Sequence, residues 1–333
     1  MESANSPLRR SGELKLLVVS DGMVRHSRLD ELASHLEAGD LLVVNDAATV
    51  PASLRGTDAS GEPLEVRLTR QIHDSIWEGV TLGQGDWRQP TEKRPAPSRL
   101  KVKDAIIFDQ HFSARVLALS NVSDRLMTLD FNLEGARLWQ SLYEHGKPIQ
   151  YSYMKEDLAL WSVQNIYSSR PWAVEMPSAG HGLTWSLLMK LFGKGIKVVS
   201  LTHGAGLSST GDRRIDAALP LVEQYEIPSS TMEAVAQTRG RKGNVIAVGT
   251  SVVRALESAD DHLSGTTSLR IGEGYRPKFV DGLLTATHEV SESHYQLLRA
   301  FLPEETLVTM TEQLEENGYL THEFGDQCLI LRS

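Results

Sequence analysis

The chain has 333 residues, 41% of them hydrophobic and 23% charged, and a formal net charge of −9 at pH 7. This ordinary globular composition and length predict two domains, or one large domain with an insertion. No apolar run approaches the ~20 residues that span a membrane, and the polar N-terminus lacks the apolar centre of a secretion signal. The single cysteine, Cys328, excludes disulfides and thiolate metal clusters within the chain. We therefore expect a soluble, cytoplasmic protein.

The first part of the chain predicts a small α/β unit. Residues 1–12 are expected to form a flexible lead-in. A helix is predicted where three leucines are spaced i, i+3 and i+7, namely Leu29, Leu32 and Leu36. The run LLVV at residues 41–44 predicts a strand buried on both faces. Asn45 follows at its carboxyl end, where α/β sheets usually hold ligands, so we treat it as a candidate binding residue.

Residues 57–132 have a different sequence pattern. Short β-rich runs separated by Gly, Pro, Asp and Ser predict a small antiparallel sheet or barrel, inserted into the main domain. Within it, residues 87–103 carry many cations and few acids: Arg88, Lys93, Arg94, Arg99, Lys101 and Lys103. Because cations supply most of the affinity for a phosphate backbone, an acidic protein that binds RNA needs such a local patch. The alternative is a solvated, proline-rich loop.

Further along, a predicted strand at residues 196–201 leads into His203, Gly204 and Gly206. The two glycines allow a ligand to approach the backbone closely. Their spacing does not fit a dinucleotide-binding fingerprint. We therefore expect a ligand-facing turn of another kind at this strand end.

The stretch NVIAVGTSVVRALES, Asn244 to Ser258, is the one around which the rest is organised. Its VIAV run predicts a buried strand, and the helix that follows aims its first N–H groups and its positive end at one spot. Thr250 and Ser251 are placed to cap this helix and to offer hydroxyls to a ligand. Arg254 opposes the helix dipole there, which favours binding to a carboxylate or a ligand. A capped turn without a ligand is the alternative.

VGTSVVRALES resembles the VGTTSVRxLES signature of the S-adenosylmethionine:tRNA ribosyltransferase-isomerase family, which acts in queuosine synthesis. Other blocks match in the same order: LLVVNDAATVPASLRG is similar to LLVxNNTRVIPARLxG, WAVEMPSAG to GSVAAPTAG, LTHGAG to LHVGAG, and GYRPKFVDGLLTATH to GYRFKVVDALLTNFH. The resemblance covers nearly the whole chain. It implies an α/β domain that carries an inserted β-barrel.

Several positions depart from the family pattern. Ala48 and Ser53 stand where the family has arginines, and Glu175 replaces a small residue. Thr202 takes the place of a family histidine, with His203 one residue later. These changes alter charge and acid–base chemistry, so they motivate interpretations other than the family reaction.

The family reaction, as the resemblance implies it, uses S-adenosylmethionine as a substrate and no other cofactor. The ribosyl unit is transferred to a 7-aminomethyl-7-deazaguanine base in tRNA and rearranges, adenine and methionine leave, and epoxyqueuosine is formed. Such chemistry needs a base beside the sulfonium and a pocket for the charged ends of methionine. These needs set the search for site residues.

The candidate catalytic residues are His288, Asp281 and His203. His288 is either an acid–base group or a structural histidine, and Asp281 either contacts substrate or braces the fold. The candidate substrate-binding residues come from the matching blocks: Asn45, Ser178, Gly180, Gly204, Gly206, Glu226, Thr250, Ser251, Arg254, Tyr275 and Arg276. For Glu226 a surface salt bridge is the alternative. No metal is expected, because His288 and His294 are predicted to face different sides of a helix.

Together these patterns predict an α/β main domain, residues 13–56 and 133–333, with an inserted small antiparallel β-barrel domain, residues 57–132. The predicted function is the family's ribosyl transfer and isomerisation on tRNA. The alternatives are a paralogue that uses S-adenosylmethionine or a related nucleoside on another acceptor, and an inactive binding homologue. All three require one cleft, formed by the loops near residues 45, 203 and 250 and by the segment 274–288.

Overall fold

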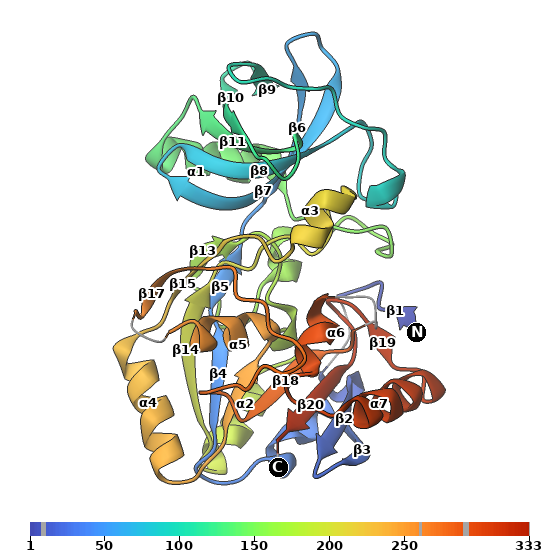
Figure 1. The fold of residues 1–333 in the computed structure, drawn as a ribbon, viewed down its shortest axis with the longest axis vertical. Helices are drawn as coiled ribbons and strands as arrows, with labels where there is room; N and C mark the ends of the chain where they lie inside the picture. The colour runs from blue at the N-terminus through green and yellow to red at the C-terminus, as the bar shows by residue number, and fades with distance from the viewer. Residues whose placement is uncertain (8–10, 260–261, 289–292, 333) are drawn as a thin grey trace.

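The computed structural model describes residues 1–7, 11–259, 262–288 and 293–332. Figure 1 shows a main domain built on a large twisted sheet, and above it a smaller β domain. The fold class predicted from the sequence, an α/β domain with an inserted antiparallel β-barrel, is confirmed.

The main sheet has nine strands within the described residues, in the order β17-β15-β14-β4-β16-β18-β20-β2-β3. Its four central strands run parallel: β14 (Lys197–His203), β4 (Leu41–Asn45), β16 (Val245–Val248) and β18 (Gly282–Ala286). The others are β17 (Ser264–Thr267), β15 (Glu223–Glu226), β20 (Gln327–Leu331), β2 (Lys15–Ser20) and β3 (Met23–Arg28). Because parallel strands end at one edge, the residues that follow the four central strands are brought together.

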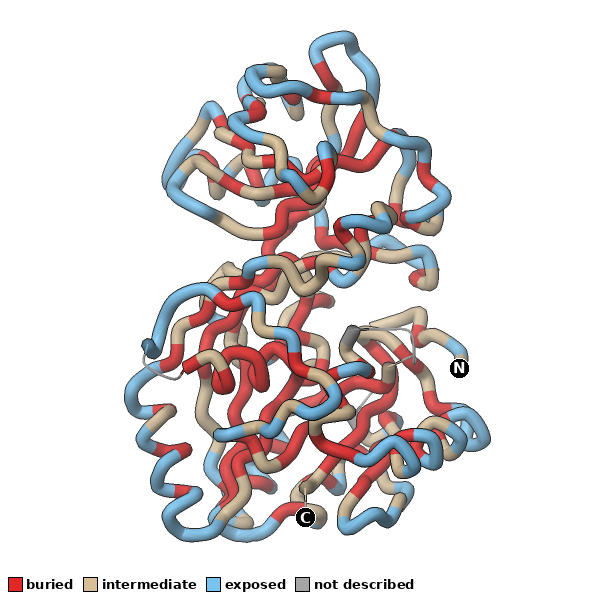
Figure 2. The backbone as a smooth tube through the Cα atoms, in the orientation of Figure 1, coloured by how far each residue is buried: buried red, intermediate tan, exposed pale blue. Residues whose placement is uncertain are grey.

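Alternate side chains of the central strands face two helical layers, with Leu41 and Val43 on one side and Leu42 and Val44 on the other. The first layer contains α4 (Ser229–Gly240), α5 (Thr250–Glu257), α6 (Ser293–Leu298) and α7 (Glu304–Glu316). The second contains η2 (Leu29–His35) and α2 (Trp185–Gly193). Figure 2 shows the strands buried between the layers. The three predicted helical leucines pack into this core, but η2 is a 3-10 helix rather than an α-helix.

The inserted domain is a closed barrel of six antiparallel strands, all within the described range 11–259. They are β6 (Ser53–Asp58), β7 (Pro63–His73), β8 (Ile76–Leu82), β11 (Leu126–Phe131), β10 (Phe112–Leu119) and β9 (Ala105–Asp109), and β9 pairs back onto β6. Helix α1 (Gly135–His145) packs Leu138 and Leu142 into the barrel core, and β12 (Gly146–Lys147) pairs with β6. These elements span 53–147, and the predicted limits of 57–132 stay a prediction.

Short elements complete the two domains. β1 (Glu2–Ser3) pairs with β19 (Leu320–Thr321), and β5 (Ala47–Thr49) pairs with β13 (Arg170–Ala173). The short helices are η1 (Ser11–Glu13), η3 (Thr91–Lys93), η4 (Leu160–Val163), η5 (Ser178–Gly180) and α3 (Arg213–Ala218). The flexible lead-in over residues 1–12 stays a prediction. In the described part of the chain, no helix combines the length and apolarity that crossing a bilayer requires.

Candidate active site

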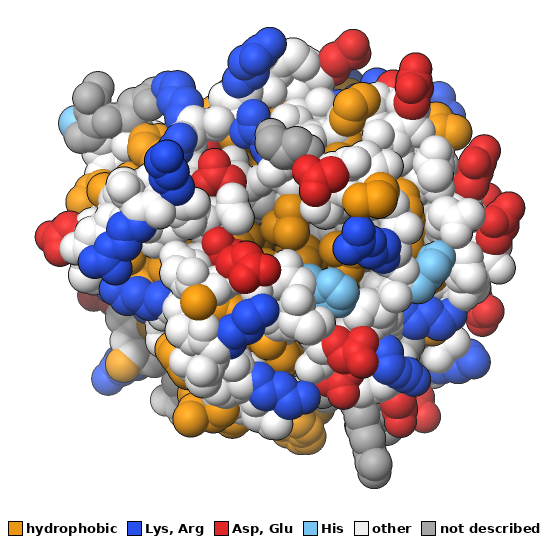
Figure 3. All heavy atoms as spheres, turned by 90° about the horizontal axis from the view of Figure 1, so that it is seen from below, with side chains coloured by type: hydrophobic (Ala, Val, Ile, Leu, Met, Phe, Trp, Pro, Cys, Tyr) orange, Lys and Arg blue, Asp and Glu red, His pale blue; other side chains and the backbone are white. Residues whose placement is uncertain are grey.

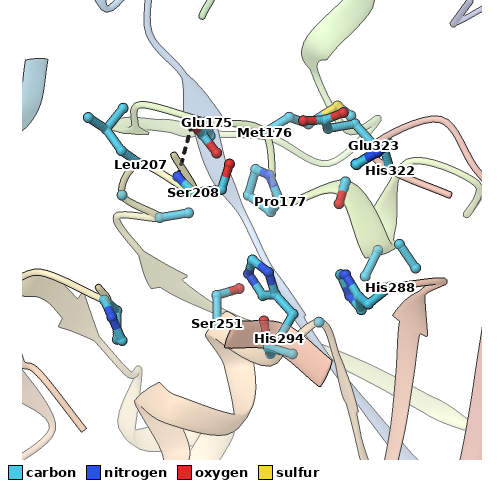
Figure 4. A pocket seen from close by; sticks show the side chains of 18 of the residues that line it. Glu175, Met176, Pro177, Leu207, Ser208, Ser251, His288, His294, His322 and Glu323 are labelled. Atoms are coloured by element: carbon cyan, nitrogen blue, oxygen red, sulfur yellow. Dashed lines mark hydrogen bonds between the residues drawn. The ribbon is translucent and has the colours of Figure 1, made fainter. Parts of the chain in front are cut away.

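A cavity of about 410 Å³ lies at the carboxyl ends of the central strands. Its walls come from the turn between β16 and α5, the residues after β18, and several loops. Six of the predicted site residues line it: Ser178, Gly206, Thr250, Ser251, Arg254 and His288. The volume falls within the ~300–1,000 Å³ typical of small-molecule sites. Figure 4 shows this space from close by.

An ion pair between Arg254 on α5 and Glu223 on β15 forms part of the cavity wall. Arg254 donates from Nη2 and Nε to Glu223 Oε2 at 2.5 and 3.1 Å, and the Gly206 N–H donates to Glu223 Oε1 at 2.8 Å. Burial by itself raises the pKa of Glu223, but the charge of Arg254 and these hydrogen bonds bring the pKa below its usual value. Arg254 therefore has a carboxylate partner, but the reason given from the sequence is wrong, because Arg254 lies in the last turn of α5, where the helix dipole does not oppose its charge.

His203 lies behind this ion pair and is fully buried. Its Nε2 is 3.4 Å from Glu223 Oε2, yet neither ring nitrogen has a hydrogen-bond partner among the described residues. Burial lowers the pKa of His203 to about 4, although the nearby Glu223 carboxylate opposes this shift. His203 is therefore neutral at neutral pH and supports the wall from behind. Its predicted catalytic role stays a prediction.

Asn45 connects the ends of neighbouring elements. Its Oδ1 accepts from the His203 N–H at 2.9 Å and from the Ala47 N–H at 3.1 Å, while its Nδ2 donates to the His203 carbonyl at 2.8 Å. The same Nδ2 lies 3.5 Å from Ser251 Oγ. Asn45 is buried and does not line the cavity. Ligand contact was predicted for Asn45 itself, but in the structure this residue positions Ser251.

The turn after β16 depends on Gly249, whose φ of +97° lies in the left-handed region that favours glycine. Gly249 is the N-cap of α5, and no side chain caps the helix, so the predicted capping by Thr250 or Ser251 is wrong. Both residues are buried and line the cavity. They bring the positive end of α5 to its edge, as the sequence predicted.

Two stacked histidine rings form another part of the cavity. The rings of His288, after β18, and His294, on α6, have centroids 4.8 Å apart and an interplanar angle of 16° (Figure 4). His288 Nε2 lies 3.0 Å from Thr285 Oγ1. Burial, reinforced by His288 and Arg254, places the pKa of His294 well below its usual value. The prediction that the two histidines face different sides of a helix is wrong. Within the described residues, no group of three or more potential ligands could hold a metal.

The opposite wall comes from loops, and none of its residues was a predicted site residue (Figure 4). The Tyr151 hydroxyl donates to Glu175 Oε1, and the Ser208 N–H donates to the same oxygen at 3.1 Å. The Tyr153 hydroxyl donates to Glu323 Oε2. Burial raises the pKa of Glu175 to about 7, with the hydrogen bond from Tyr151 opposing and the charge of Glu323 adding to this shift. We call Tyr151, Tyr153, Glu175 and Glu323 the acidic aromatic wall.

Three predicted site residues lie at the far ends of α5 and the central strands. Asp281 Oδ2 accepts from the Val245 N–H at 3.0 Å, where β16 begins. The Tyr275 hydroxyl donates to the carboxylate of Glu257, the last residue of α5, at 3.2 Å, and Arg276 is exposed beside it. The prediction that 274–288 forms a cleft wall is therefore wrong for 274–281. This part of the segment holds the end of α5 instead.

Glu226, Gly180 and Gly204 also lie outside the cavity lining. Glu226 forms a half-exposed ion pair with Arg170 at 2.7 Å, which is the alternative that the sequence left open. A Cβ added at Gly180 would lie 1.9 Å from the Tyr167 hydroxyl oxygen, and one at Gly204 would lie 3.0 Å from a backbone carbonyl. The two glycines permit close packing next to the cavity.

Comparisons with known proteins cover almost the entire chain. A family model described as queuosine biosynthesis protein matches residues 1–330. The chain belongs to this family. The S-adenosylmethionine:tRNA ribosyltransferase-isomerase of Thermosynechococcus vestitus is 31% identical over 99% of this chain and 92% of that protein. The enzyme of the same name from Gloeobacter violaceus is 32% identical, over 98% and 92%.

The fold of the queuosine biosynthesis family is also seen in a crystal structure of S-adenosylmethionine tRNA ribosyltransferase from Thermotoga maritima. The two structures superpose with a TM-score of 0.54 at 24% identity, covering 99% of this chain and 96% of the other. The kinship that the motif blocks indicated is confirmed by the family match and by the full-length relatives.

This family member has cavity residues that the motif comparison missed. Glu175 offered one signal, because it replaces a small residue inside an otherwise matching block. Glu223 was not selected, since its partner Arg254 is distant in sequence. Tyr151 and Tyr153 gave no signal, because isolated tyrosines in a loop have no pattern that reveals their partners.

The basic stretch 87–103 is only partly available to a partner. Arg94 is buried and paired with Glu65, and Arg88 is paired with Asp86 at 2.8 Å. Besides Arg88, the exposed cations of the stretch are Lys93, Arg99, Lys101 and Lys103. Figure 3 views the main domain from below, at the end away from the barrel, where basic and acidic side chains are interspersed.

Proposed function

We propose that this chain is an S-adenosylmethionine:tRNA ribosyltransferase-isomerase. It transfers and isomerises the ribosyl moiety of S-adenosylmethionine onto a 7-aminomethyl-7-deazaguanine base in tRNA, and epoxyqueuosine is the product. The supporting observation is the match of the queuosine biosynthesis family model to residues 1–330, together with two relatives of this name that align along nearly their whole length. A substrate in tRNA places the reaction in the cytoplasm.

Arg254 and His288 are our candidates for the central roles in this reaction. Glu223 occupies Nε and Nη2 of Arg254, which leaves Nη1 to bind the carboxylate of the methionine moiety. His288 lines the same cavity and takes the proton released from a carbon beside the sulfonium. Ser251, at the positive end of α5, then lies beside the sugar. These assignments keep the chemistry at the edge where the central strands end.

The four exposed cations of the barrel stretch other than Arg88 are our candidate contacts to the tRNA backbone. Lys93, Arg99, Lys101 and Lys103 give this acidic protein the local patch that phosphate binding requires. Replacing all four by Gln is expected to weaken tRNA binding and to flatten its salt dependence. S-adenosylmethionine binding serves as the control and is expected to stay unchanged.

Release of adenine and methionine tests the proposal. The protein is incubated with S-adenosylmethionine, with and without tRNA that carries the aminomethyl-deazaguanine base. Release that requires the modified tRNA, and that is lost in His288→Ala while the far-UV circular dichroism is unchanged, supports the proposal. Turnover that survives in His288→Ala contradicts the role of His288, and no turnover with modified tRNA contradicts the enzyme assignment.

A second candidate function is ribosyl transfer to an acceptor other than tRNA. The replacement of two family arginines by Ala48 and Ser53, and the additional carboxylate of Glu175, favour it. The same assay separates the two functions, because this alternative predicts adenine release with a small amine acceptor and none that depends on tRNA. A binding homologue without activity would bind S-adenosylmethionine and release nothing.

A further inference from the structure

The acidic aromatic wall is built, by its geometry, to hold carboxylates at a fixed place in the cavity. Tyr151 and Tyr153 each donate a hydroxyl hydrogen bond to a carboxylate, Tyr151 to Glu175 and Tyr153 to Glu323. The Ser208 N–H, at 3.1 Å, is a second donor to Glu175. All four wall residues line the cavity, so the carboxylates are fixed next to the space that a ligand would fill.

Stacked rings hold the two tyrosines in place. The rings of Tyr151 and Tyr153 have centroids 6.1 Å apart at 22°, and those of Tyr153 and His322 are 4.2 Å apart at 6°. His322 has a φ of +69°, which is uncommon for a residue other than glycine. Such conformations persist where the surrounding structure imposes them, and they concentrate at binding and catalytic sites.

The charged side chains on the two sides of the cavity differ in whether they have a partner of opposite charge. Glu223 is neutralised by Arg254 at 2.5 Å. Glu175 and Glu323, in contrast, form no ion pair with a lysine or arginine of the described residues, and the charge of Glu323 adds to the rise in the pKa of Glu175. A buried carboxylate is expensive without a charged partner, so a cation supplied by a ligand would stabilise this wall.

We propose that the acidic aromatic wall, with Glu175 at its centre, is the subsite that recognises a cationic group of the substrate, a sulfonium or an alkylammonium. Carboxylates supply the charge complement, and the tyrosine hydroxyls beside them hold the carboxylates in place at the cavity. The resemblance places a small residue at the position of Glu175, so this carboxylate is a feature of this chain's own cavity. The proposal rests on the proposed function, which brings cationic substrates to the cavity.

Two parts of the reaction can supply such a cation. S-adenosylmethionine carries a sulfonium and an α-ammonium group, and the acceptor base carries an aminomethyl group. The probes are chosen in matched pairs that differ in one cationic group: S-adenosylmethionine and S-adenosylhomocysteine for the sulfonium, S-adenosylhomocysteine and its desamino analogue for the ammonium, and 7-aminomethyl-7-deazaguanine and 7-methyl-7-deazaguanine for the acceptor.

The experiment measures the affinity of each probe by isothermal titration calorimetry for wild type, Glu175→Gln and Glu305→Gln. Glu175→Gln keeps the size and hydrogen bonding of the side chain, while Glu305, exposed in the first turn of α7, is the matched control. We expect Glu175→Gln to lower the affinity for the charged member of one pair at least tenfold, and to change the affinity for the partner without that cationic group by less than twofold. The affected pair identifies the cation.

Two results would overturn the proposal. One is a wild-type protein that does not prefer the charged member of any pair. The other is a Glu175→Gln variant that weakens charged and neutral probes equally, because Glu175 would then shape the cavity without recognising charge. Adenine release from modified tRNA is measured separately. If the protein discriminates charge but releases no adenine, the proposed function is wrong and the cation subsite is supported. If it releases adenine but does not discriminate charge, the cation subsite is wrong and the proposed function is supported.

Discussion

The two sides of the cavity differ in the partners that their buried charged groups have. On the strand-end wall, formed by Glu223, Ser251 and Arg254 and supported from behind by Asn45 and His203, the ionic groups are paired with each other and the histidine is kept neutral. On the acidic aromatic wall, hydroxyl groups orient two carboxylates but do not neutralise them. The first wall is therefore a scaffold that is complete without a ligand, and the second retains charge that a ligand can complement.

The largest expected effect comes from breaking the ion pair of the strand-end wall. Glu223→Ala leaves Arg254, whose side chain is 11% exposed, without its partner, and we expect a loss of about 3–5 kcal/mol of unfolding free energy. Urea denaturation measures it. Glu226→Ala is the control, because its ion pair with Arg170 is about 40% exposed and should cost at most about 1 kcal/mol. Equal losses in both variants would show that the buried pair is no different from a surface pair.

The neutral state of His203 predicts how this wall responds to acid. Its pKa falls from 6.5 to about 4 on folding because of burial, so its contribution to stability is complete above pH 6.5 and is lost as the pH falls toward 4. The shift corresponds to about 3 kcal/mol. Unfolding free energies between pH 4 and pH 7 should therefore fall more steeply for wild type than for His203→Gln. Parallel curves would contradict a neutral, buried His203.

The acidic aromatic wall should show its pH dependence in ligand affinity rather than in the free energy of unfolding. Glu175 faces Tyr151, Ser208, Glu323 and the nearby Arg67, and its pKa is about 7. Because a cation binds the ionised carboxylate, we expect affinity for the cationic probe to rise about tenfold from pH 6 to pH 8. In Glu175→Gln this rise should be absent. A wild-type affinity that is constant over this pH range would show that ionisation of Glu175 does not contribute to cation binding.

The smallest expected effect concerns the hydroxyl of Tyr153. Tyr153→Phe keeps the ring stacked on His322 and removes the hydrogen bond to Glu323, so affinity for the cationic probe should fall by about 1 kcal/mol, less than tenfold. Calorimetric titration at pH 8 measures this change. An effect larger than that of Glu175→Gln would move the centre of the subsite from Glu175 to Glu323.

The strand-end wall was largely accessible to sequence reasoning. Buried apolar runs predicted strands that lead to Asn45, His203 and Thr250, and parallel strands necessarily end at one edge. Arg254 was expected to bind a carboxylate or a ligand, although Glu223 was not named and Arg254 lies in the last turn of α5, where the dipole does not oppose its charge. The same reasoning did not place Tyr275, and for Asp281 it left bracing of the fold open as the alternative to substrate contact. They lie in a block that matches the family, but a matching block does not specify which end of a strand or helix its residues occupy.

Patterns along the chain predicted the barrel insertion, the central strands and the turn at Gly249, because each of these features depends on the local spacing of apolar residues and glycines. The acidic aromatic wall depends on contacts between loops, with Tyr151 and Glu175 separated by 24 positions and Tyr153 and Glu323 by 170. No local periodicity encodes such pairs. Burial and the neighbouring carboxylate shift the pKa of Glu175, and both arise only when folding brings those loops together over the sheet edge.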